Sequence, residues 1–264
     1  MKSISGISIA AGLVMGLALT PQAHAAITVQ NFWHMGEDGN QNPTDSVGGK
    51  NFTGGFSTTV ASEHSSYGGS TSSLNYNGFA GNYMGSASDA INVPATNWML
   101  EVWVNFNSLN GQVNIASLGV DTAGDGSVKS WGKIGFSGNN FFFGRENDTY
   151  GVLSDVSVVT NKWYSLAFVQ YDGQIHGFVD GVEADDHNWG DSGASFNNNG
   201  QIHLGVKPGG GQNLDGWLDN VRFSTFAQGA FSTSDLMAAP VPEPASMAVL
   251  GLGALALLRR RKRA

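Results

Sequence analysis

Apolar and polar positions alternate strictly along two stretches of the chain. In the first, Leu100, Val102, Val104 and Phe106 are separated by Glu101, Trp103 and Asn105. The second covers 217–224. A period of two residues is typical of a β-strand that buries one face, so both stretches are predicted strands. No stretch combines a long helical period with capping residues, and the one helical element that we expect is a short turn within 232–239.

Turn dipeptides divide the chain into further short strands. Six pairs combine Asn or Asp with Gly, the composition of tight turns that need positive φ angles. They are Asn77-Gly78, Asn110-Gly111, Asp172-Gly173, Asp180-Gly181, Asn199-Gly200 and Asp215-Gly216. Asp172-Gly173 separates the apolar and aromatic stretch 163–171 from 174–179. Asp180-Gly181 then separates 174–179 from the segment that begins at Val182. Together these segments predict a three-stranded meander.

Composition supports an all-β domain with a packed core. The 37 glycines indicate many tight turns, while 15 Phe and 7 Trp supply the apolar mass that disordered chains lack. Short strands joined by Gly-rich turns predict an antiparallel two-sheet jelly-roll sandwich rather than a parallel α/β sheet. Residues 26–239 are long enough to form one such domain. Within 121–160 the pattern does not fix where the strands lie.

The first 25 residues carry the features of a secretory signal peptide. Lys2 precedes a mostly apolar stretch over 4–19 that is rich in Gly and Ala and short for a membrane span. Pro21 ends this stretch, and Ala23-His24-Ala25 offers the small-x-small pattern that signal peptidase recognises. We therefore predict cleavage after Ala25. The alternative is a permanent N-terminal anchor.

The last residues, 240–264, combine three features in order. Pro242-Glu243-Pro244 comes first, an apolar stretch over 245–258 follows, and a basic cluster over 259–263 that begins with Arg259, Arg260 and Arg261 comes last. Two glycines in the apolar stretch suit a membrane helix, and the cations place its C-terminal end on the cytoplasmic side. A basic tail without a helix would explain the arginines but not the apolar stretch.

This tail resembles the PEP-CTERM sorting signal of exosortase substrates. The resemblance implies a Gram-negative cell envelope, transient anchoring in the inner membrane and processing by a membrane-bound exosortase. It also implies export to the outer surface or the extracellular matrix. The protein would then be a substrate of signal peptidase and of the exosortase.

Charge and cysteine content exclude several functions. Six of the 13 cations and one of the 21 carboxylates lie in the two terminal segments, so residues 26–241 carry 7 cations against 20 carboxylates. Such an acidic domain lacks the clustered Lys and Arg that nucleic-acid binding needs. With no cysteine, neither a disulfide nor a Cys-ligated metal can form.

Four segments together resemble the concanavalin A-like, laminin-G-type jelly roll. They cover nearly all of 30–238 in the family's order. The first is Phe32-Trp33-His34-Met35-Gly36-Glu37 with the turn Asp45-Ser46-Val47-Gly48, and the second is 98–106. The third runs from 161 to 182, and the fourth is 216–223 followed by 231–236. The resemblance implies a lectin-like domain, in a family that often carries a Ca²⁺ site.

Asp219 is the leading candidate for a metal ligand. In a regular strand it shares a face with Trp217, Val221 and Phe223, and that face is expected to point into the core. A buried carboxylate needs hydrogen bonds or a cation. One hypothesis is Ca²⁺, with Glu37, Asp38 or Asp45 supplying further oxygens. The alternative is a structural Asp held by backbone amides or by an Arg.

The remaining polar motifs do not form a catalytic site. Asp121 and Asp125 lack EF-hand spacing, and the acidic segment 183–186 lacks the alternating carboxylates of jelly-roll glycosidases. The histidines have no zinc-ligand spacing, and no nucleophile lies in a Gly-x-Ser-x-Gly motif. We therefore predict a protein that is not an enzyme.

Aromatic residues suggest a different function, the binding of sugars. Trp131, Trp189 and 141–143 lie near predicted loops, where their rings could stack on a glycan, whereas Trp103, Trp163 and Trp217 lie in strands and are expected in the core. The leading hypothesis is an exported protein that binds carbohydrate or another extracellular polymer through its loops. The alternatives are a structural matrix component without a small ligand and, third, a glycan hydrolase or lyase.

Overall fold

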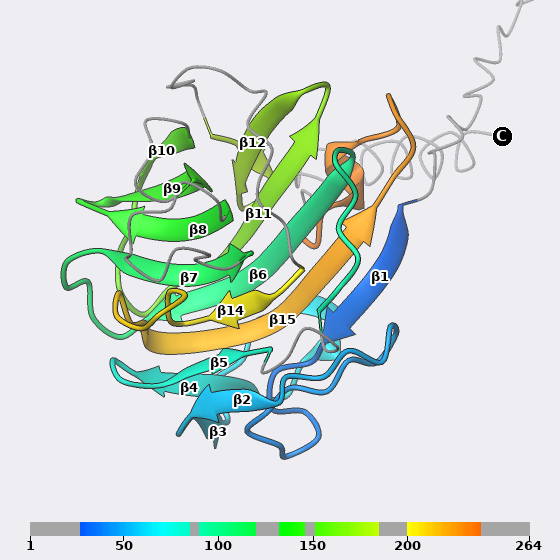
Figure 1. Ribbon diagram of the computed structural model, residues 1–264. Coiled ribbons are helices and arrows are strands. Elements are labelled where there is room, and N and C mark those ends of the chain that lie inside the picture. The colour runs from blue at the N-terminus through cyan, green and yellow to red at the C-terminus, as the bar shows by residue number, and fades with distance from the viewer. Residues whose placement is uncertain (1–26, 85–89, 120–131, 146–150, 185–199, 239–264) are drawn as a thin grey trace, which may run out of the picture.

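The computed structural model describes residues 27–84, 90–119, 132–145, 151–184 and 200–238. Within these ranges the chain forms two antiparallel sheets that pack face to face, as Figure 1 shows. The prediction of an all-β, two-sheet jelly-roll sandwich is confirmed. The signal peptide predicted over 1–25 and the sorting signal predicted over 240–264 lie outside the described residues. Within those residues, no helix is both long enough and apolar enough to cross a membrane.

The first sheet, sheet A, is built around two long strands, β15 (Asp215–Thr225) and β6 (Trp98–Phe106). Beyond β6 follow β11 (Trp163–Tyr171), β12 (Gln174–Val179) and β13 (Val182–Glu183). Beyond β15, β4 (Ser73–Asn77) pairs with its first half and is followed by β3 (Thr59–Ala61). The second half of β15 pairs with β1 (Thr28–Trp33).

The second sheet, sheet B, is centred on β7 (Val113–Leu118). On one side follow β8 (Gly132–Ser137), β9 (Asn140–Arg145) and β10 (Gly151–Ser157). On the other side follow β14 (Ile202–Leu204), β5 (Gly81–Tyr83) and β2 (Gly54–Phe56). Strands β8, β9 and β10 occupy the stretch 121–160 that the sequence left without assigned strands.

The predicted meander is present as β11, β12 and β13. Asp172 and Gly173 have φ angles of 51° and 73°, and Asp180 and Gly181 have φ angles of 52° and 80°. Both pairs therefore form the predicted tight turns with positive φ. The turn predicted at Asp215-Gly216 is wrong. These two residues begin β15, where their backbone pairs with β4.

The core lies between the two sheets. It receives the apolar set of β6 that the sequence predicted, together with aromatic side chains from both sheets. Phe141 and Phe143 of β9 are fully buried there, so their placement near a loop was wrong. The predicted helical turn near the end of the domain is present as the 3₁₀ turn η2 (Thr233–Asp235).

A β-bulge in β15 changes which of its residues face the core. Leu218 pairs with Val104 and Val221 pairs with Val102, but Asp219 and Asn220 together stand opposite the single residue Trp103. The extra residue, Asn220, has a positive φ of 43°. Because of it, Asp219 shares the outer face with Trp217 while Val221 enters the core. The expectation that Asp219 points into the core is wrong for this reason.

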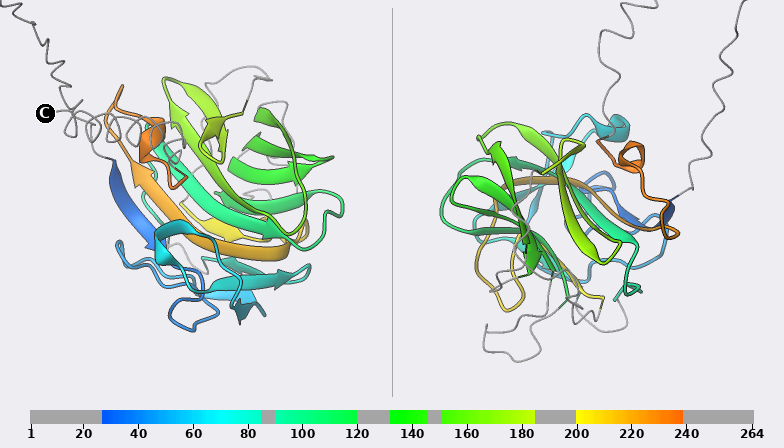
Figure 2. Two further views of the ribbon diagram at one scale, coloured as in Figure 1. Left: turned by 180° about the vertical axis from the view of Figure 1, so that it is seen from behind. Right: turned by 90° about the horizontal axis from the view of Figure 1, so that it is seen from above.

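Two segments cover parts of the outer face of sheet A. The loop that carries the 3₁₀ turn η1 (Tyr67–Gly69) lies over the middle of β15, and the chain after β15 forms a second apolar cluster over Met99 of β6. The left view of Figure 2 looks onto this face, with η1 in cyan and the segment after β15 in orange. These two segments therefore shield part of the outer face of sheet A from solvent.

Candidate functional site

A row of directly opposed residues crosses the outer face of sheet B. His203 of β14 stands between Tyr83 of β5 and Ser117 of β7, and Ser117 stands opposite Lys133 of β8. The next row along the strands contains Leu204 and Ile134, which are fully buried in the core. Since side chains alternate between the two faces of a sheet, the His203 row points away from the core.

Glycines let the larger side chains of this face lie flat. A Cβ added to Gly54 would lie 2.4 Å from the Tyr83 ring, and one added to Gly151 would lie 2.5 Å from the Phe142 ring. A Cβ added to Gly135 would lie 2.4 Å from the Lys133 side chain. Each flat side chain therefore rests over a residue without a Cβ. The result is a smooth surface of aromatic rings and aliphatic stems.

The Tyr83 and His203 rings form the floor of a pocket. They are stacked, with ring centroids 5.8 Å apart and an interplanar angle of 16°. The pocket has a volume of about 240 Å³, and its wall is the loop after β14, with Val206, Lys207 and Gly210. Tyr83 and His203 are partly exposed, and neither side chain makes a hydrogen bond within the described ranges. In this part of the chain His203 Nδ1 is buried without a partner, and the Tyr83 hydroxyl is left to meet a ligand.

Burial lowers the pKa of His203 to about 4. The imidazole is therefore neutral at neutral pH and carries both a donor and an acceptor nitrogen. A neutral aromatic ring of this kind suits a ligand made of hydroxyl groups better than it suits an ionic one. Next to it, Lys133 Nζ donates a 2.6 Å hydrogen bond to Gln212 Oε1, and Asn114 Nδ2 donates to the Val206 carbonyl. These two contacts tie the pocket wall to the sheet.

Asp219, the predicted metal ligand, is fully buried under the η1 loop. Its Oδ2 accepts a 2.8 Å hydrogen bond from the Ser65 backbone N–H, and its Oδ1 accepts one of 2.7 Å from Asn220 Nδ2. Burial raises the pKa of Asp219, and the hydrogen bonds from Ser65 oppose the rise. The arrangement corresponds to the structural alternative, a carboxylate held by a backbone amide.

Glu37 fastens the same loop from its other end. Its carboxylate accepts hydrogen bonds from the backbone N–H groups of Thr71 and Ser72 and from the hydroxyls of Ser70 and Thr71. Burial acts to raise the pKa of Glu37, but these four donors outweigh it and lower the pKa to about 2. Asp38 has different partners, since Oδ1 accepts from the Asn40 N–H and Oδ2 from the Thr44 hydroxyl.

Asp45 holds the turn that follows β1. Oδ1 accepts from the N–H groups of Phe32, Val47 and Gly48, and Oδ2 accepts from Asn31 Nδ2 and the Lys50 N–H. Burial opposes these donors, yet the pKa of Asp45 is lowered. The turn that resembled the family pattern is thus built around this carboxylate.

The three predicted ligands do not form a joint cation site in this arrangement. Glu37 and Asp219 both hold the loop that carries η1, but each carboxylate, including that of Asp45, already accepts hydrogen bonds that a cation would displace. Nowhere in the described ranges do three or more His, Asp or Glu side chains gather closely enough to hold a metal ion. Calcium binding stays a prediction, and the geometry favours the structural alternative.

The strand tryptophans lie elsewhere than the sequence suggested. Trp103, Trp163 and Trp217 are outside the core, on the outer face of sheet A, and each is partly exposed. The prediction that these strand residues lie in the core is wrong, since Trp103 alternates with the apolar set of β6. The loop candidates Trp131 and Trp189 lie outside the described residues.

Of the acidic residues in the segments 183–186 and 121–125, only Glu183 lies within the described residues. Glu183 lies in β13, where it is exposed and its Oε1 lies 2.6 Å from His176 Nδ1. The other members of the segment, Asp185 and Asp186, lie outside the described residues, as do Asp121 and Asp125. The row across sheet B contains no carboxylate.

Two family patterns match the chain. Residues 79–230 match the concanavalin A-like lectin/glucanases superfamily, and residues 240–263 match the PEP-CTERM protein-sorting motif. The sorting motif implies export, processing by an exosortase and a destination in the cell envelope. No curated protein matches the chain in sequence.

Several solved structures share the fold. Domain 4 of AbnA, a GH43 extracellular arabinanase from Geobacillus stearothermophilus in complex with arabinotriose, is 18% identical with a TM-score of 0.58, over 81% of this chain and 98% of that domain. The Trypanosoma rangeli sialidase in complex with sialic acid is 13% identical with a TM-score of 0.53, over 79% of this chain and 32% of the sialidase. The botulinum neurotoxin serotype G binding domain is 14% identical with a TM-score of 0.53, over 79% of this chain and 50% of that domain.

Proposed function

This chain belongs to the concanavalin A-like lectin/glucanases superfamily, and on that premise we propose that it is an exported, non-enzymatic protein that binds carbohydrate. The sugar site is the outer face of sheet B, at the pocket floored by Tyr83 and His203. The destination is the surface or extracellular matrix of a Gram-negative-type cell. An extracellular polysaccharide is the expected partner.

The observation that carries the proposal is the stacked Tyr83–His203 pair on a face flattened by glycines. A sugar ring presents an apolar C–H face that packs on flat aromatic rings, while its hydroxyls need donors and acceptors at the edge. The Tyr83 hydroxyl and the neutral His203 imidazole supply both at the floor of the pocket. The site therefore combines the two features that a glycan needs.

The comparisons give this proposal its context. Two of these neighbours are complexes with a sugar, arabinotriose for the arabinanase domain and sialic acid for the sialidase. The match spans 98% of the arabinanase domain and 81% of this chain. These similarities support a sugar-binding role and leave the identity of the sugar to experiment.

The absence of enzymatic activity is part of the same proposal. Glycoside hydrolysis generally uses two carboxylates that face the scissile bond. The row Tyr83, His203, Ser117, Lys133 offers none, and Glu183 lies in sheet A rather than sheet B. A reducing-sugar assay with arabinan and soluble glucans is expected to stay flat, and steady release of sugar would contradict this part.

The binding test is affinity electrophoresis of the purified protein in gels that contain arabinan, galactomannan or hydroxyethylcellulose. Tyr83→Ala is expected to weaken retardation about tenfold, because a stacked ring at the floor of a pocket is a typical hot spot. Tyr83→Phe keeps the ring and is expected to retain most of the binding.

Val47→Ala provides the matched control, since Val47 is 55% exposed in the turn after β1. It is expected to migrate as the parent protein does. Equal retardation of Tyr83→Ala and the parent in every gel would refute the proposed site.

A further inference from the structure

A second aromatic surface lies on the opposite side of the sandwich, on the outer face of sheet A. Trp217 of β15 and Trp163 of β11 both stand directly opposite Asn105 of β6. Trp103, two residues before Asn105, lies on the same face. All three indoles are partly exposed. We refer to Trp217, Asn105, Trp163 and Trp103 as the tryptophan strip.

Polar atoms without partners gather in the strip. Asn105 is only 7% exposed, yet its side chain makes no hydrogen bond in the described part of the chain, and its Oδ1 is buried. The indole Nε1 atoms of Trp103 and Trp217 are also buried without a partner there. Buried polar groups in native proteins are nearly always satisfied by protein or by another molecule. Within the described residues these buried atoms have no partner, and they lie beside the indole rings that reach the surface.

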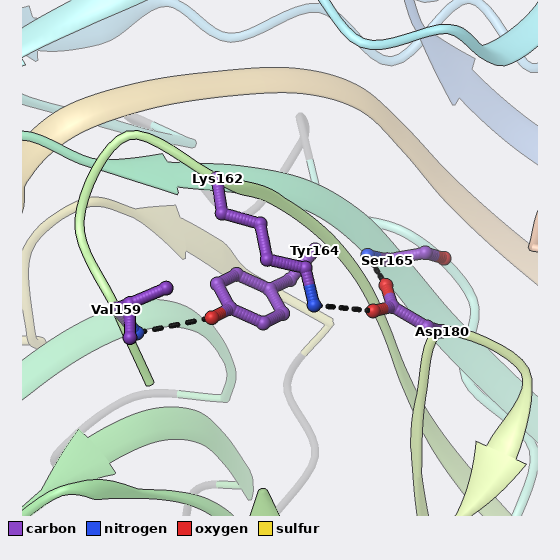
Figure 3. Close-up of polar contacts among 5 residues, drawn as sticks. All are labelled: Val159, Lys162, Tyr164, Ser165 and Asp180. Atoms are coloured by element: carbon purple, nitrogen blue, oxygen red, sulfur yellow. Dashed lines mark hydrogen bonds and ion pairs between the residues drawn. The ribbon is translucent and has the colours of Figure 1, made fainter. Parts of the chain in front are cut away.

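The cation next to Trp163 in the chain forms an ion pair within the meander. Lys162 precedes Trp163 in the chain, and its Nζ lies 3.3 Å from Asp180 Oδ2 and 4.2 Å from the centre of the Tyr164 ring; Figure 3 shows the lysine reaching over that ring to Asp180. The same figure shows Asp180 Oδ1 accepting from the Ser165 N–H and the Tyr164 hydroxyl accepting from the Val159 N–H. The Lys162 side chain is thereby held by residues of β11 and of the turn after β12.

The immediate neighbours of the strip are amides and hydroxyls. Asn75 of β4 follows Trp217 in the same cross-strand row, and Thr59 of β3 follows Asn75. At the end of β15, the Asp215 carboxylate is occupied by Asn107 Nδ2 and the Ser108 hydroxyl. Apart from the Asp215 carboxylate, the described neighbours of the strip are uncharged polar side chains, and together with the indoles they complement a ligand that is rich in hydroxyl groups and carries no negative charge.

We propose that the tryptophan strip is a second carbohydrate-binding site, and that its ligand is an extended neutral polysaccharide. Trp217 and Trp163 lie two strands apart, which is about 10 Å across a sheet. Two sugar rings of one linear chain can stack on these indoles while the Asn105 amide meets a hydroxyl between them. A linear glycan running across the strands satisfies both the rings and the unpartnered amide.

The strip and the sheet B pocket point in opposite directions, because they lie on the two outer faces of one sandwich. If both bind, one molecule holds two glycan chains and cross-links them. The strip as a binding site stands on its own residues, whereas the cross-linking rests on the proposed function of the Tyr83–His203 pocket. The two parts fail separately in the experiment below.

The test is affinity electrophoresis of the purified protein in hydroxyethylcellulose, galactomannan and arabinan gels, with Trp163→Leu and Trp217→Leu as variants. Leucine keeps an apolar side chain and removes the stacking ring. Each change is expected to weaken retardation about tenfold in at least one gel, and Trp217→Tyr is expected to restore most of it. Unchanged retardation of both leucine variants in all three gels overturns the strip.

Cross-linking is measured as turbidity or increased viscosity when the protein is added to a dissolved polysaccharide. The parent is expected to raise it, while Trp217→Leu and Tyr83→Ala each keep one face and lose the effect. Loss of binding in Trp217→Leu but not in Tyr83→Ala supports the strip and refutes the pocket. Loss in Tyr83→Ala alone supports the pocket and refutes the strip.

Two controls separate binding from folding. Val182→Ala alters a 70% exposed apolar residue at the edge of the same sheet and is expected to behave as the parent does. Thermal unfolding of each variant verifies that the sandwich is intact. Since the binding signal is compared at a temperature well below every midpoint, a stability change by itself does not produce the pattern of loss and tyrosine rescue.

Discussion

The outer faces of the two sheets are shaped by different kinds of residue. Sheet A presents large indoles and a buried ion pair and covers part of itself with the η1 loop and the segment after β15. Sheet B uses glycines, so that Tyr83, Lys133 and Phe142 lie flat on the strands. In this fold an outer face can therefore be shaped for a ligand either by adding bulk or by removing Cβ atoms.

The difference extends to electrostatics. On sheet A, Arg222 Nη2 lies 2.6 Å from Glu101 Oε2, and Glu101 is fully buried. Burial raises the pKa of Glu101, and the Arg222 charge and the Met237 N–H oppose the rise. On sheet B, the neutral imidazole of His203 lies in the same row as the buried Lys133, whose Nζ donates to the neutral Gln212 Oε1. The buried carboxylate of sheet A is thus paired with a cation, whereas the buried lysine of sheet B donates to an amide.

The largest expected effect comes from breaking the pair on sheet A. Arg222→Met leaves the Glu101 carboxylate buried without its cation and removes the hydrogen bond from Arg222 to the Asp235 carbonyl. We expect the free energy of unfolding to fall by about 3–5 kcal/mol, measured by urea denaturation. The double variant Arg222→Met with Glu101→Leu is the control and is expected to recover much of this loss. A single variant as stable as the parent would show that the cover of sheet A does not depend on the pair.

The next effect comes from adding a Cβ to the flat face of sheet B. Gly54→Ala would push the Tyr83 ring off the strand, since the new methyl lies 2.4 Å from that ring. We expect a loss of about 1–3 kcal/mol in stability together with weaker binding of polysaccharide.

Gly177→Ala is the matched control for this change. Its added methyl meets the Phe143 ring in the core at 2.2 Å, so it is expected to lower stability without weakening binding. Equal binding by Gly54→Ala and the parent would show that the flat position of Tyr83 is not needed.

A smaller effect is expected from the pH dependence of His203. The pKa of His203 is about 4 in the folded protein against 6.5 for an ordinary histidine. As the pH falls from 6.5 toward 4, the unfolded chain gains a proton that the folded chain does not, so stability is lost in that window. At pH 5 the free energy of unfolding is lower than at neutral pH by an amount on the order of 2 kcal/mol.

The measurement is the midpoint of thermal unfolding between pH 7 and pH 4. His203→Gln is expected to flatten the decline, while His64→Gln, at an exposed position in the loop over sheet A, serves as the control. Parallel curves for His203→Gln and the parent would place the acid sensitivity outside sheet B.

The smallest effect is expected from calcium. Because Asp219 is already held by Ser65 and Asn220, adding Ca²⁺ or a chelator should move the unfolding midpoint by less than about 1 °C. A stabilisation of several degrees that Asp219→Ala abolishes would restore the calcium hypothesis and place the cation under the η1 loop. This titration decides between the two interpretations of Asp219 that the sequence left open.

The strands and turns that the sequence predicted correctly are those whose formation depends on residues close together in the chain. The alternation in β6 and the Asp-Gly turns of the β11–β13 meander depend on neighbouring residues alone. The bulge at Asn220 does not, because an extra residue becomes visible only when β15 is laid against β6. One residue therefore moved Asp219 from the predicted inner face to the outer one.

The candidate binding face was missed for a related reason. Tyr83 and His203 lie 120 positions apart and meet only because β5 and β14 are neighbours in sheet B. Gly54 and Gly151 meet the Tyr83 and Phe142 rings only across neighbouring strands, so the sequence contains no local signal for the flat face. The sequence predicted sugar binding through aromatic rings, but the pairing that brings two of them together is a property of the sheet.

The position of β15 has a consequence for the order of folding. This strand is the last one in the described residues, yet it pairs with β1, β4 and β6, so that Thr28 of the first strand meets Thr225. A chain that emerges from a membrane channel with its N-terminus first cannot close sheet A until β15 has followed. Such long-range pairing delays folding and keeps the early strands unpaired during passage. An exported protein of this topology therefore stays unfolded while it is being translocated and forms the sandwich only on the far side of the membrane.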